Sequence, residues 1–467
     1  MASALQLHPA AGRHPRQRLE VTSLLALGGT GVVVVAAVLY GWEALLIAAV
    51  FAVPLVVAIR ARPQRGVLIL TALVPFDGLL LIVPHGQTAK SWKEALVLAI
   101  LGATFVAPEE ARGARGRRLP RWALPLSLFV LLALVSAIEI GGQQALTGFR
   151  IDFIYVLLAW AVWRCPLSST ERDRLVTILM AMGVITAVVG LAQQVIGPDR
   201  LNALGYQYNG AIRTTGPFLR SFSTFSDPFA FAFFLMVVVL VCLPVALSEP
   251  RRTRNRYFLL LLPVLAASLA LTFVRGAWLG LAVGLAYLGW RRHRVLFVAV
   301  PFLLVAVLYL PSSVATAALS GSTLAERGSG WQANLDQVVS HPLGVGIGSS
   351  GAAGEKVASL ESAGTTQRVA NFEINQVFIP DNYYYKTVYE LGVIGLWLFM
   401  VFLVSAFLSS RAASLRLSGR DAALSLGITA QVAAVAAAST VTTYLELFPA
   451  PVLFWLLLAV VATCDRE

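Results

Sequence analysis

Charged residues are scarce in this sequence. Asp, Glu, Lys and Arg together make up 13% of the 467 residues, while hydrophobic residues make up 58%. Soluble domains carry about 25% charged residues, so too few charges remain here to cover a surface in water. With a mean hydropathy of +0.76, the composition excludes a water-soluble globular enzyme and indicates a chain embedded largely in a lipid bilayer.

Cysteine is also scarce. The three cysteines, Cys165, Cys242 and Cys464, lie near the ends of apolar stretches and have no metal-ligand spacing. This pattern implies neither a disulfide framework nor a zinc site. We expect neither a metal nor another cofactor.

Long apolar runs, by contrast, recur along the whole chain. Many are long enough to span a bilayer, and a few fall short of the span length. They lie at residues 21–40, 44–59, 66–83, 94–107, 122–139, 149–163, 175–196, 228–247, 257–274, 276–290, 295–311, 385–408, 422–440 and 450–464. We therefore expect an all-α, polytopic membrane protein with about 12–14 transmembrane helices.

These stretches suggest four regions along the chain. An N-terminal set of about seven helices would occupy residues 1–196. A second set, with the loop 197–227, would follow over residues 197–311. A large loop over residues 312–384 would then precede about three C-terminal helices in residues 385–467.

Basic residues outnumber acidic ones, 36 against 24, which gives a net charge of +12. Such an excess can indicate a nucleic-acid partner, but its placement favours a membrane explanation. If the amino terminus is cytoplasmic, 25 of the 36 basic residues fall in short cytoplasmic loops. This positive-inside pattern predicts that both termini are cytoplasmic, with anionic headgroups rather than nucleic acid near the loops.

The remaining basic residues lie on the predicted outer side and include three notable arginines. Arg213 and Arg220 flank a Thr-Thr-Gly-Pro-Phe-Leu segment, and Arg275 lies at the outer mouth of a tight helical hairpin. Guanidinium groups grip phosphate oxygens bidentately and keep their charge. Three converging arginines would form a diphosphate site, although Arg275 could instead reach up to lipid headgroups.

The large loop has patterns of its own. Apolar residues between about 319 and 340, including Trp331, alternate with polar ones such as Arg327 at helical spacing, which predicts an amphipathic helix at the interface. The glycines from Gly344 to Gly354 follow it. They form either a flexible or tightly turned loop, or a backbone that closely approaches a phosphate or a sugar.

A polar segment, Asp381-Asn382-Tyr383, closes this loop. Asp381 and Asn382 could be ordinary helix caps. Alternatively, Asp381 accepts a proton from a sugar hydroxyl and Tyr383 stacks on a pyranose face.

Two further acidic residues lie within or near apolar stretches. Glu390 follows Lys386 by four residues, so it is either a member of an ion pair or a second site carboxylate. Asp77 is an intramembrane acid and hence a functional candidate, unless Pro75 places it at the outer interface.

Four stretches, in this order, resemble motifs of the O-antigen ligase and polysaccharide polymerase superfamily of bacterial membrane glycosyltransferases. They are Arg213-Thr-Thr-Gly-Pro-Phe with Phe225-Ser-Asp-Pro-Phe-Ala, Thr272-Phe-Val-Arg-Gly-Ala-Trp-Leu-Gly280, Arg327 and Trp331 with His341-Pro-Leu-Gly-Val-Gly-Ile-Gly348, and Asp381-Asn-Tyr with Glu390-Leu-Gly-Val-Ile-Gly395.

The resemblance implies a GT-C-like enzyme of the bacterial inner membrane. Such an enzyme transfers a glycan from a polyprenyl (undecaprenyl) diphosphate donor to a sugar hydroxyl of a second lipid-linked glycan on the outer face. Arg213, Arg220 and Arg275 would hold the leaving diphosphate, and Asp381 would orient or deprotonate the acceptor in a metal-independent, inverting displacement. Secondary or glycan-binding roles would fall to Asn382, Tyr383, Arg327, Trp331 and Glu390, and a chain-length regulator would be a further partner.

Alternative functions remain open at this level. Ligases of the superfamily usually carry His-Asn where this chain has Asp381-Asn382, which favours a polymerase over a ligase that passes glycan to lipid A core or protein. A transporter or flippase of an anionic lipid-linked glycan is a third hypothesis. Transporters commonly show repeated halves and midplane charges, whereas here the charges gather at the predicted outer helix ends and no repeat is evident.

Overall fold

A computed structural model describes residues 57–83, 91–112, 118–301, 338–362, 380 and 382–464. The chain divides into two compact units, Met1–Ile59 and Arg60–Glu467, and the description below concerns the second. The apolar stretch predicted at 21–40 and most of those at 44–59 and 295–311 lie outside the described residues. The same is true of the amphipathic helix predicted at about 319–340, except for its last three residues.

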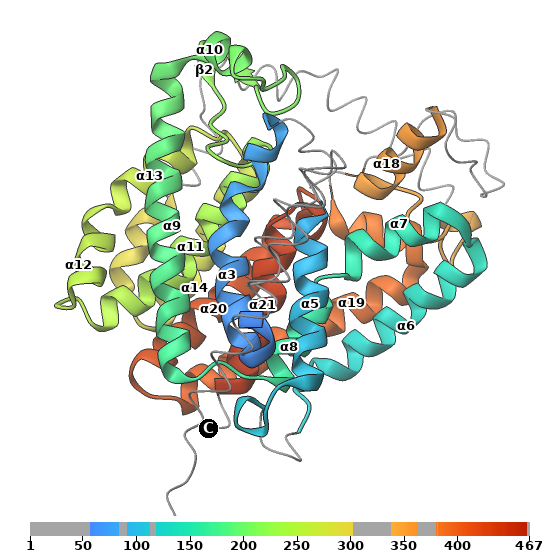
Figure 1. Ribbon diagram of the computed structural model, residues 1–467, viewed down its shortest axis with the longest axis horizontal. Coiled ribbons are helices and arrows are strands. Elements are labelled where there is room, and N and C mark those ends of the chain that lie inside the picture. Colours follow the sequence, from blue (N-terminus) through green and yellow to red (C-terminus); the bar gives the residue numbers. More distant parts are fainter. Residues whose placement is uncertain are drawn as a thin grey trace, which may run out of the picture. The chain divides into compact units, whose positions relative to one another are not determined.

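The described part of the chain is almost wholly helical (Figure 1). Its α-helices are α3 (Pro63–Leu73), α5 (Trp92–Val106), α6 (Ala123–Ile140), α7 (Gly142–Phe153), α8 (Val156–Arg164), α9 (Ser169–Ile196), α10 (Pro198–Ala203), α11 (Pro228–Ser248), α12 (Thr253–Leu260), α13 (Leu262–Ala270), α14 (Arg275–Arg291), α18 (Gly351–Ser362), α19 (Tyr383–Arg416), α20 (Gly419–Ala438) and α21 (Ala450–Cys464). Short 3-10 helices are η1 (Val74–Leu81), η2 (Glu109–Ala111), η3 (Arg294–Val298) and η4 (Tyr444–Glu446), and β1 (Thr214–Thr215) pairs antiparallel with β2 (Phe218–Leu219).

Within the described residues, six helices are long and apolar enough to cross a membrane, and a bent pair raises this number to seven. The bent pair is α7 and α8, which meet at an angle of 49°. The chain is therefore an all-α, multi-pass membrane protein, as the sequence predicts. The total of 12–14 spans stays a prediction.

Three predicted spans are interrupted in the structure. The stretch 257–274 is divided at Leu261 into α12 and α13, with Pro263 in the first turn of α13, where a missing N–H costs nothing. The stretch 149–163 contains the bend between α7 and α8. In α19 the break falls at Gly392, whose φ of +67° is readily adopted only by glycine.

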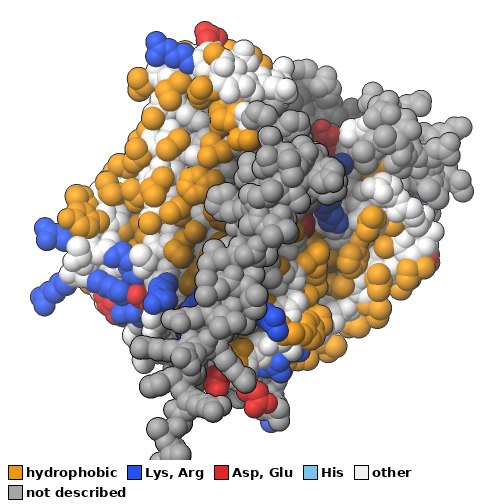
Figure 2. Space-filling view, viewed as in Figure 1, with side chains coloured by type: hydrophobic (Ala, Val, Ile, Leu, Met, Phe, Trp, Pro, Cys, Tyr) orange, Lys and Arg blue, Asp and Glu red, His pale blue; other side chains and the backbone are white. Residues whose placement is uncertain are grey.

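The helices differ in how they are buried. α11 is apolar on every side and buried along nearly its whole length by α9, α14 and α20, as expected for a helix with no polar face. α6 is also strongly apolar, but only 22% of it is buried. Figure 2 shows hydrophobic side chains spread over α6 and α9, which is the surface that a bilayer would cover.

Ion pairs connect the helices at the end of the molecule where α9 begins and α19 finishes. The buried Arg172 side chain pairs with Asp421, at the start of α20, over 2.8 Å. Asp173 accepts from Arg252, Arg254 and Arg420. These pairs join α9 to the start of α12 and to the start of α20. We name this side of the molecule the arginine-rich end.

Candidate functional site

A short hairpin after α10 carries two of the predicted site arginines. The backbone N–H of Arg220 donates to the Arg213 carbonyl over 2.8 Å, so the two residues lie opposite each other where the β1–β2 ladder ends. Their guanidinium carbons lie 5.7 and 5.1 Å from the centre of the Phe229 ring. Both cations thus lie close to one aromatic ring, whose quadrupole attracts them.

The hairpin packs against the segment that precedes α14. Ser221 N–H donates to the Leu271 carbonyl, and Arg220 Nε donates to the Thr272 carbonyl over 3.1 Å. The rings of Phe218 and Phe273 are in contact, with centroids 6.2 Å apart. Because Arg275 follows two residues after Phe273, the structure brings the three arginines onto two contacting segments. Arg213, Arg220, Arg275 and the Phe229 ring are named the arginine site.

Phe273 has an unusual backbone conformation at this contact. Its φ of +53° lies in the left-handed region, which a bulky residue rarely adopts and which costs of order 1–3 kcal/mol. The Phe218 ring contact, together with the two hydrogen bonds from the hairpin to the adjacent carbonyls, holds this turn. The direction in which Arg275 leaves the turn therefore depends on the hairpin.

The arginine site carries excess positive charge. In the part of the chain that the structure describes, none of its arginines forms an ion pair with a carboxylate. The nearby Asp227 instead caps α11, accepting from the N–H groups of Phe229 and Ala230 over 2.8 and 3.0 Å.

Burial and the neighbouring Arg213 lower the pKa of Arg220 to about 10. Arg220 therefore stays charged at neutral pH, and desolvation strengthens its attraction for an anion. Such a site suits a multiply charged, phosphate-like group.

The structure describes only some of the site residues predicted in the large loop and at its end. Asp381, Arg327 and Trp331 lie outside the described residues. Asn382 caps α19, accepting from the N–H groups of Tyr384 and Tyr385, which confirms the cap alternative.

Tyr383 differs from the prediction of a sugar-stacking ring. Its side chain is 4% exposed and packs on Phe399, with ring centroids 5.1 Å apart. With so little of the side chain exposed, neither face of the ring is open to a pyranose in this structure.

Glu390 belongs to a buried charge cluster, which confirms the ion-pair alternative. Lys386 Nζ lies 2.9 Å from Glu390 Oε2, 2.7 Å from Asp152 Oδ2 and 3.4 Å from Glu446 Oε1. All four side chains are at most 5% exposed. We name this cluster, formed by Asp152, Lys386, Glu390 and Glu446, the loop anchor.

The sequence analysis missed Asp152 and Glu446. Asp152 falls inside an apolar stretch, and an acid at such a position is a functional candidate by default, so a signal for it existed. Glu446 lies in the short connection before α21, where an acid is unremarkable. Nothing local in the sequence associates Asp152 with Lys386, 234 positions away.

The glycine run forms tight turns that pack on protein. Gly344, Gly346, Gly348 and Gly351 all have positive φ values. A Cβ at Gly346 would overlap Ile140, and one at Gly348 would come within 2.6 Å of the Gln144 carbonyl oxygen. This confirms the tightly turned loop and shows backbone that approaches other helices.

The Asp77 carboxylate also has partners within the protein. It accepts from Trp92 Nε1 over 2.9 Å and pairs with Lys93 over 3.0 Å. Asp77 therefore fastens η1 to the start of α5.

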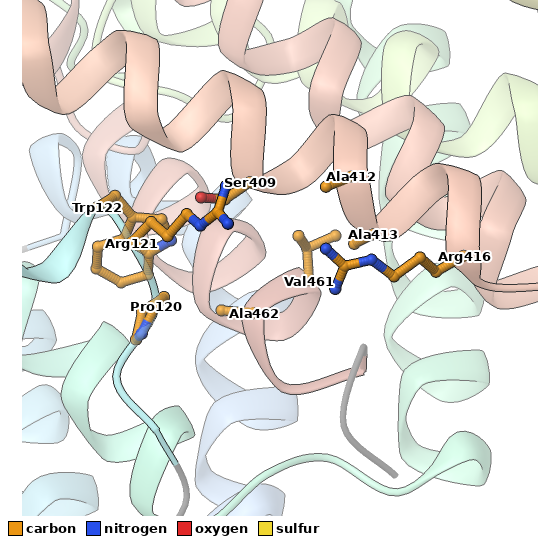
Figure 3. Close-up of a pocket in the computed structure, with 9 residues that line it drawn as sticks. All are labelled: Pro120, Arg121, Trp122, Ser409, Ala412, Ala413, Arg416, Val461 and Ala462. Atoms are coloured by element: carbon orange, nitrogen blue, oxygen red, sulfur yellow. The ribbon is translucent and has the colours of Figure 1, made fainter.

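A pocket at the arginine-rich end lies apart from these residues. It is formed by the segment just before α6 and the last turns of α19 and α21 (Figure 3). Arg121 and Arg416 border it among small side chains such as Ala412 and Ala462. Its place among the predicted cytoplasmic arginines suits contact with lipid headgroups rather than the chemistry expected of the arginine site. Among the described residues, no group of three His, Cys, Asp or Glu side chains is arranged to hold a metal ion.

The fold and these sites define a multi-pass membrane protein with a charged site beside its helix ends. Two comparisons with known proteins show what the chain is similar to. Residues 257–400 match the family model described as O-antigen ligase. An O-antigen polymerase of Salmonella muenchen is 24% identical over 339 residues, which cover 69% of this chain and 74% of the relative.

The chain is similar to proteins of the O-antigen ligase and polymerase superfamily, the family that its motifs indicate. It is a glycosyltransferase-type membrane enzyme of the polymerase or ligase kind, and the family acts on lipid-linked glycans. The residues that match the family model include Arg275 and Glu390 but not the hairpin with Arg213 and Arg220.

Proposed function

We propose that this protein is a polysaccharide polymerase. It transfers a glycan from a polyprenyl diphosphate donor to a sugar hydroxyl of a second lipid-linked glycan. The observation that carries the proposal is the arginine site, in which Arg213 and Arg220 share the Phe229 ring and Arg220 contacts the turn before Arg275. The relative named as an O-antigen polymerase supports the same reaction.

In this proposal the arginine site binds the donor diphosphate. As the bond between the anomeric carbon and the phosphate oxygen breaks, the electron pair stays on the diphosphate, where negative charge develops. Fixed guanidinium groups stabilise that charge more strongly than water does, because they need no reorganisation during the step. The acceptor hydroxyl attacks from the opposite face, which inverts the anomeric carbon.

The sequence supplies a candidate for the group that takes the proton of the attacking hydroxyl. Asp381 directly precedes Asn382, the cap of α19, and a carboxylate there would orient the attacking hydroxyl or take its proton. This role rests on sequence and family resemblance alone, since Asp381 lies outside the described residues.

We further propose that the site faces the outer side of the membrane and that both termini are cytoplasmic. The arginine distribution supports this orientation. A reporter fused after Arg292 should remain cytoplasmic, and one inserted in residues 355–365 should be exported. The opposite pattern would reverse the proposed sidedness.

Purified protein supplied with polyprenyl diphosphate oligosaccharide tests the reaction directly. A polymerase lengthens the lipid-linked glycan and releases free polyprenyl diphosphate. The second candidate function is a ligase, which the description of the family model favours. A ligase would release polyprenyl diphosphate only when lipid A core or an acceptor protein is added.

A further inference from the structure

The start of α18 is fastened to the membrane-embedded helices through buried charges. Glu390 Oε1 accepts from both the backbone N–H and the hydroxyl of Ser350, over 3.0 and 2.9 Å. The Glu446 carboxylate packs on Gly351, where an added Cβ would lie 2.6 Å from Oε2. Two carboxylates therefore adjoin the first turn of α18, where free N–H groups and the helix dipole favour negative charge.

The glycine run is joined to the same part of α19 by backbone hydrogen bonds. Val345 and Gly346 N–H donate to the carbonyls of Tyr389 and Glu390, over 2.8 and 2.9 Å. The Gly392 break in α19 lets its backbone approach Pro342 and Leu343. The described part of the large loop thus contacts α19 at Tyr389, Glu390 and Gly392, just after Lys386.

One ammonium group serves three carboxylates in this cluster. Lys386 is the cation that contacts Asp152, Glu390 and Glu446, and the Tyr383 ring lies 5.6 Å from its nitrogen. Asp152 Oδ1 has no hydrogen-bond partner among the described residues. Removing one partner from such a cluster leaves uncompensated buried charge, which is strongly destabilising.

We propose that Lys386 is a positioning residue for glycan transfer, because it holds the carboxylates that fix the start of α18 and the glycine run to the membrane-embedded helices. This proposal rests on the function proposed above. The arginine site lies on other elements, so Lys386 acts on the arrangement of the large loop and leaves the donor diphosphate contacts unchanged.

Lys386→Met is the direct test, with Lys93→Met as the matched control. Lys93 is also a lysine paired with a carboxylate, Asp77, but it fastens η1 rather than the large loop. Hydrogen exchange followed by mass spectrometry should show faster exchange for residues 342–359 in Lys386→Met and unchanged exchange in α11. Lys93→Met should leave residues 342–359 protected.

The kinetic readout separates positioning from donor binding. In Lys386→Met we expect kcat to fall roughly 10- to 100-fold, as for a misplaced reacting group, with the donor KM changed less than about twofold.

A milder variant covers the case in which Lys386→Met does not fold. Ser350→Ala removes one donor to Glu390 and leaves every charge in place, so exchange should rise only around residues 345–353. Unchanged exchange in both variants would overturn the anchor, and faster exchange with unchanged kcat would overturn the positioning role. A wild-type protein that extends no glycan would overturn the proposed function, while the exchange result would still test the anchor.

Discussion

Arginines at the two ends of the molecule have different surroundings. At the arginine-rich end they form ion pairs with carboxylates on neighbouring helices, in the pairs Arg172–Asp421, Arg252–Asp173, Arg254–Asp173 and Arg420–Glu249. In the arginine site, within the described residues, the guanidinium groups of Arg213 and Arg220 meet carbonyl oxygens and one aromatic ring.

This difference separates structure from function. The charge of a paired surface arginine is balanced by its carboxylate partner, so it attracts a further anion only weakly. The pair contributes modestly to the free energy of unfolding. Burial and, to a smaller extent, the neighbouring Arg213 lower the pKa of Arg220, and an anion that binds there offsets the cost of holding the two charges together. The contrast predicts that substitutions in the arginine site affect transfer and that those at the arginine-rich end affect stability.

The largest effect is expected from Arg275→Ala. Loss of a donor that stabilises developing charge typically lowers kcat about 100- to 1,000-fold, and we expect chain extension to fall by that factor while the protein stays folded. Arg200→Ala, which removes an exposed arginine from α10, is the control. If both variants extend glycans at the wild-type rate, the arginine site is wrongly assigned.

A smaller effect is expected from the Phe218–Phe273 contact. Phe273→Ala removes the ring that joins the hairpin to the turn before Arg275 and should lower kcat/KM about 10-fold through misplacement of that side chain. Phe105→Ala, which interrupts the aromatic contact with Trp160 elsewhere, should leave kcat/KM unchanged. Equal kcat/KM losses in the two variants would show that the first is merely a packing defect.

The loop anchor should make stability depend on pH. Burial raises the pKa of the Glu446 carboxyl from its ordinary value of 4.5 to about 7, so the folded protein holds a proton that the unfolded chain releases between these values. Stability conferred by this proton is complete below pH 4.5 and is lost as pH rises to about 7.

Glu446→Gln cannot release that proton. Its Tm relative to the wild type should therefore rise by roughly 2–4 °C between pH 5 and pH 8, as measured by thermal unfolding in detergent. A Tm difference that does not depend on pH would show that Glu446 is ionised at every pH tested.

The smallest effect is expected from Arg420→Ala at the arginine-rich end. The Arg420 side chain is 36% exposed and shares Asp173 with Arg252 and Arg254, so its loss should lower the free energy of unfolding by less than about 1 kcal/mol. Chain extension should stay within twofold of the wild type. A large loss of activity would end the contrast between the two ends.

The sequence predicts the helical, multi-pass fold because long apolar runs have few stable solutions in a bilayer. Hydropathy locates apolar stretches but does not show where the helix backbone bends within them. It therefore does not predict the breaks at Leu261 and Gly392. The positive-inside pattern directs attention to Arg213, Arg220 and Arg275 as exceptions, and that reasoning needs no three-dimensional information.

The loop anchor shows where sequence reasoning stops. The spacing of Lys386 and Glu390 by four residues indicates an ion pair, and the structure contains it. The other two carboxylates, Asp152 and Glu446, come from distant elements that only the packing of α7, η4 and α19 brings together. Their association depends on tertiary structure, to which local patterns are blind.

Binding of a diphosphate lipid to the arginine site tests the central claim most directly. The measurement compares the Kd of a short-chain polyprenyl diphosphate for the wild type, for Arg200→Ala and for a triple variant with Arg213, Arg220 and Arg275 replaced by alanine. Each charged hydrogen bond contributes about 1.5–3 kcal/mol, so the triple variant should bind at least about 100-fold more weakly while Arg200→Ala binds as the wild type does. An unchanged Kd in the folded triple variant would contradict the account.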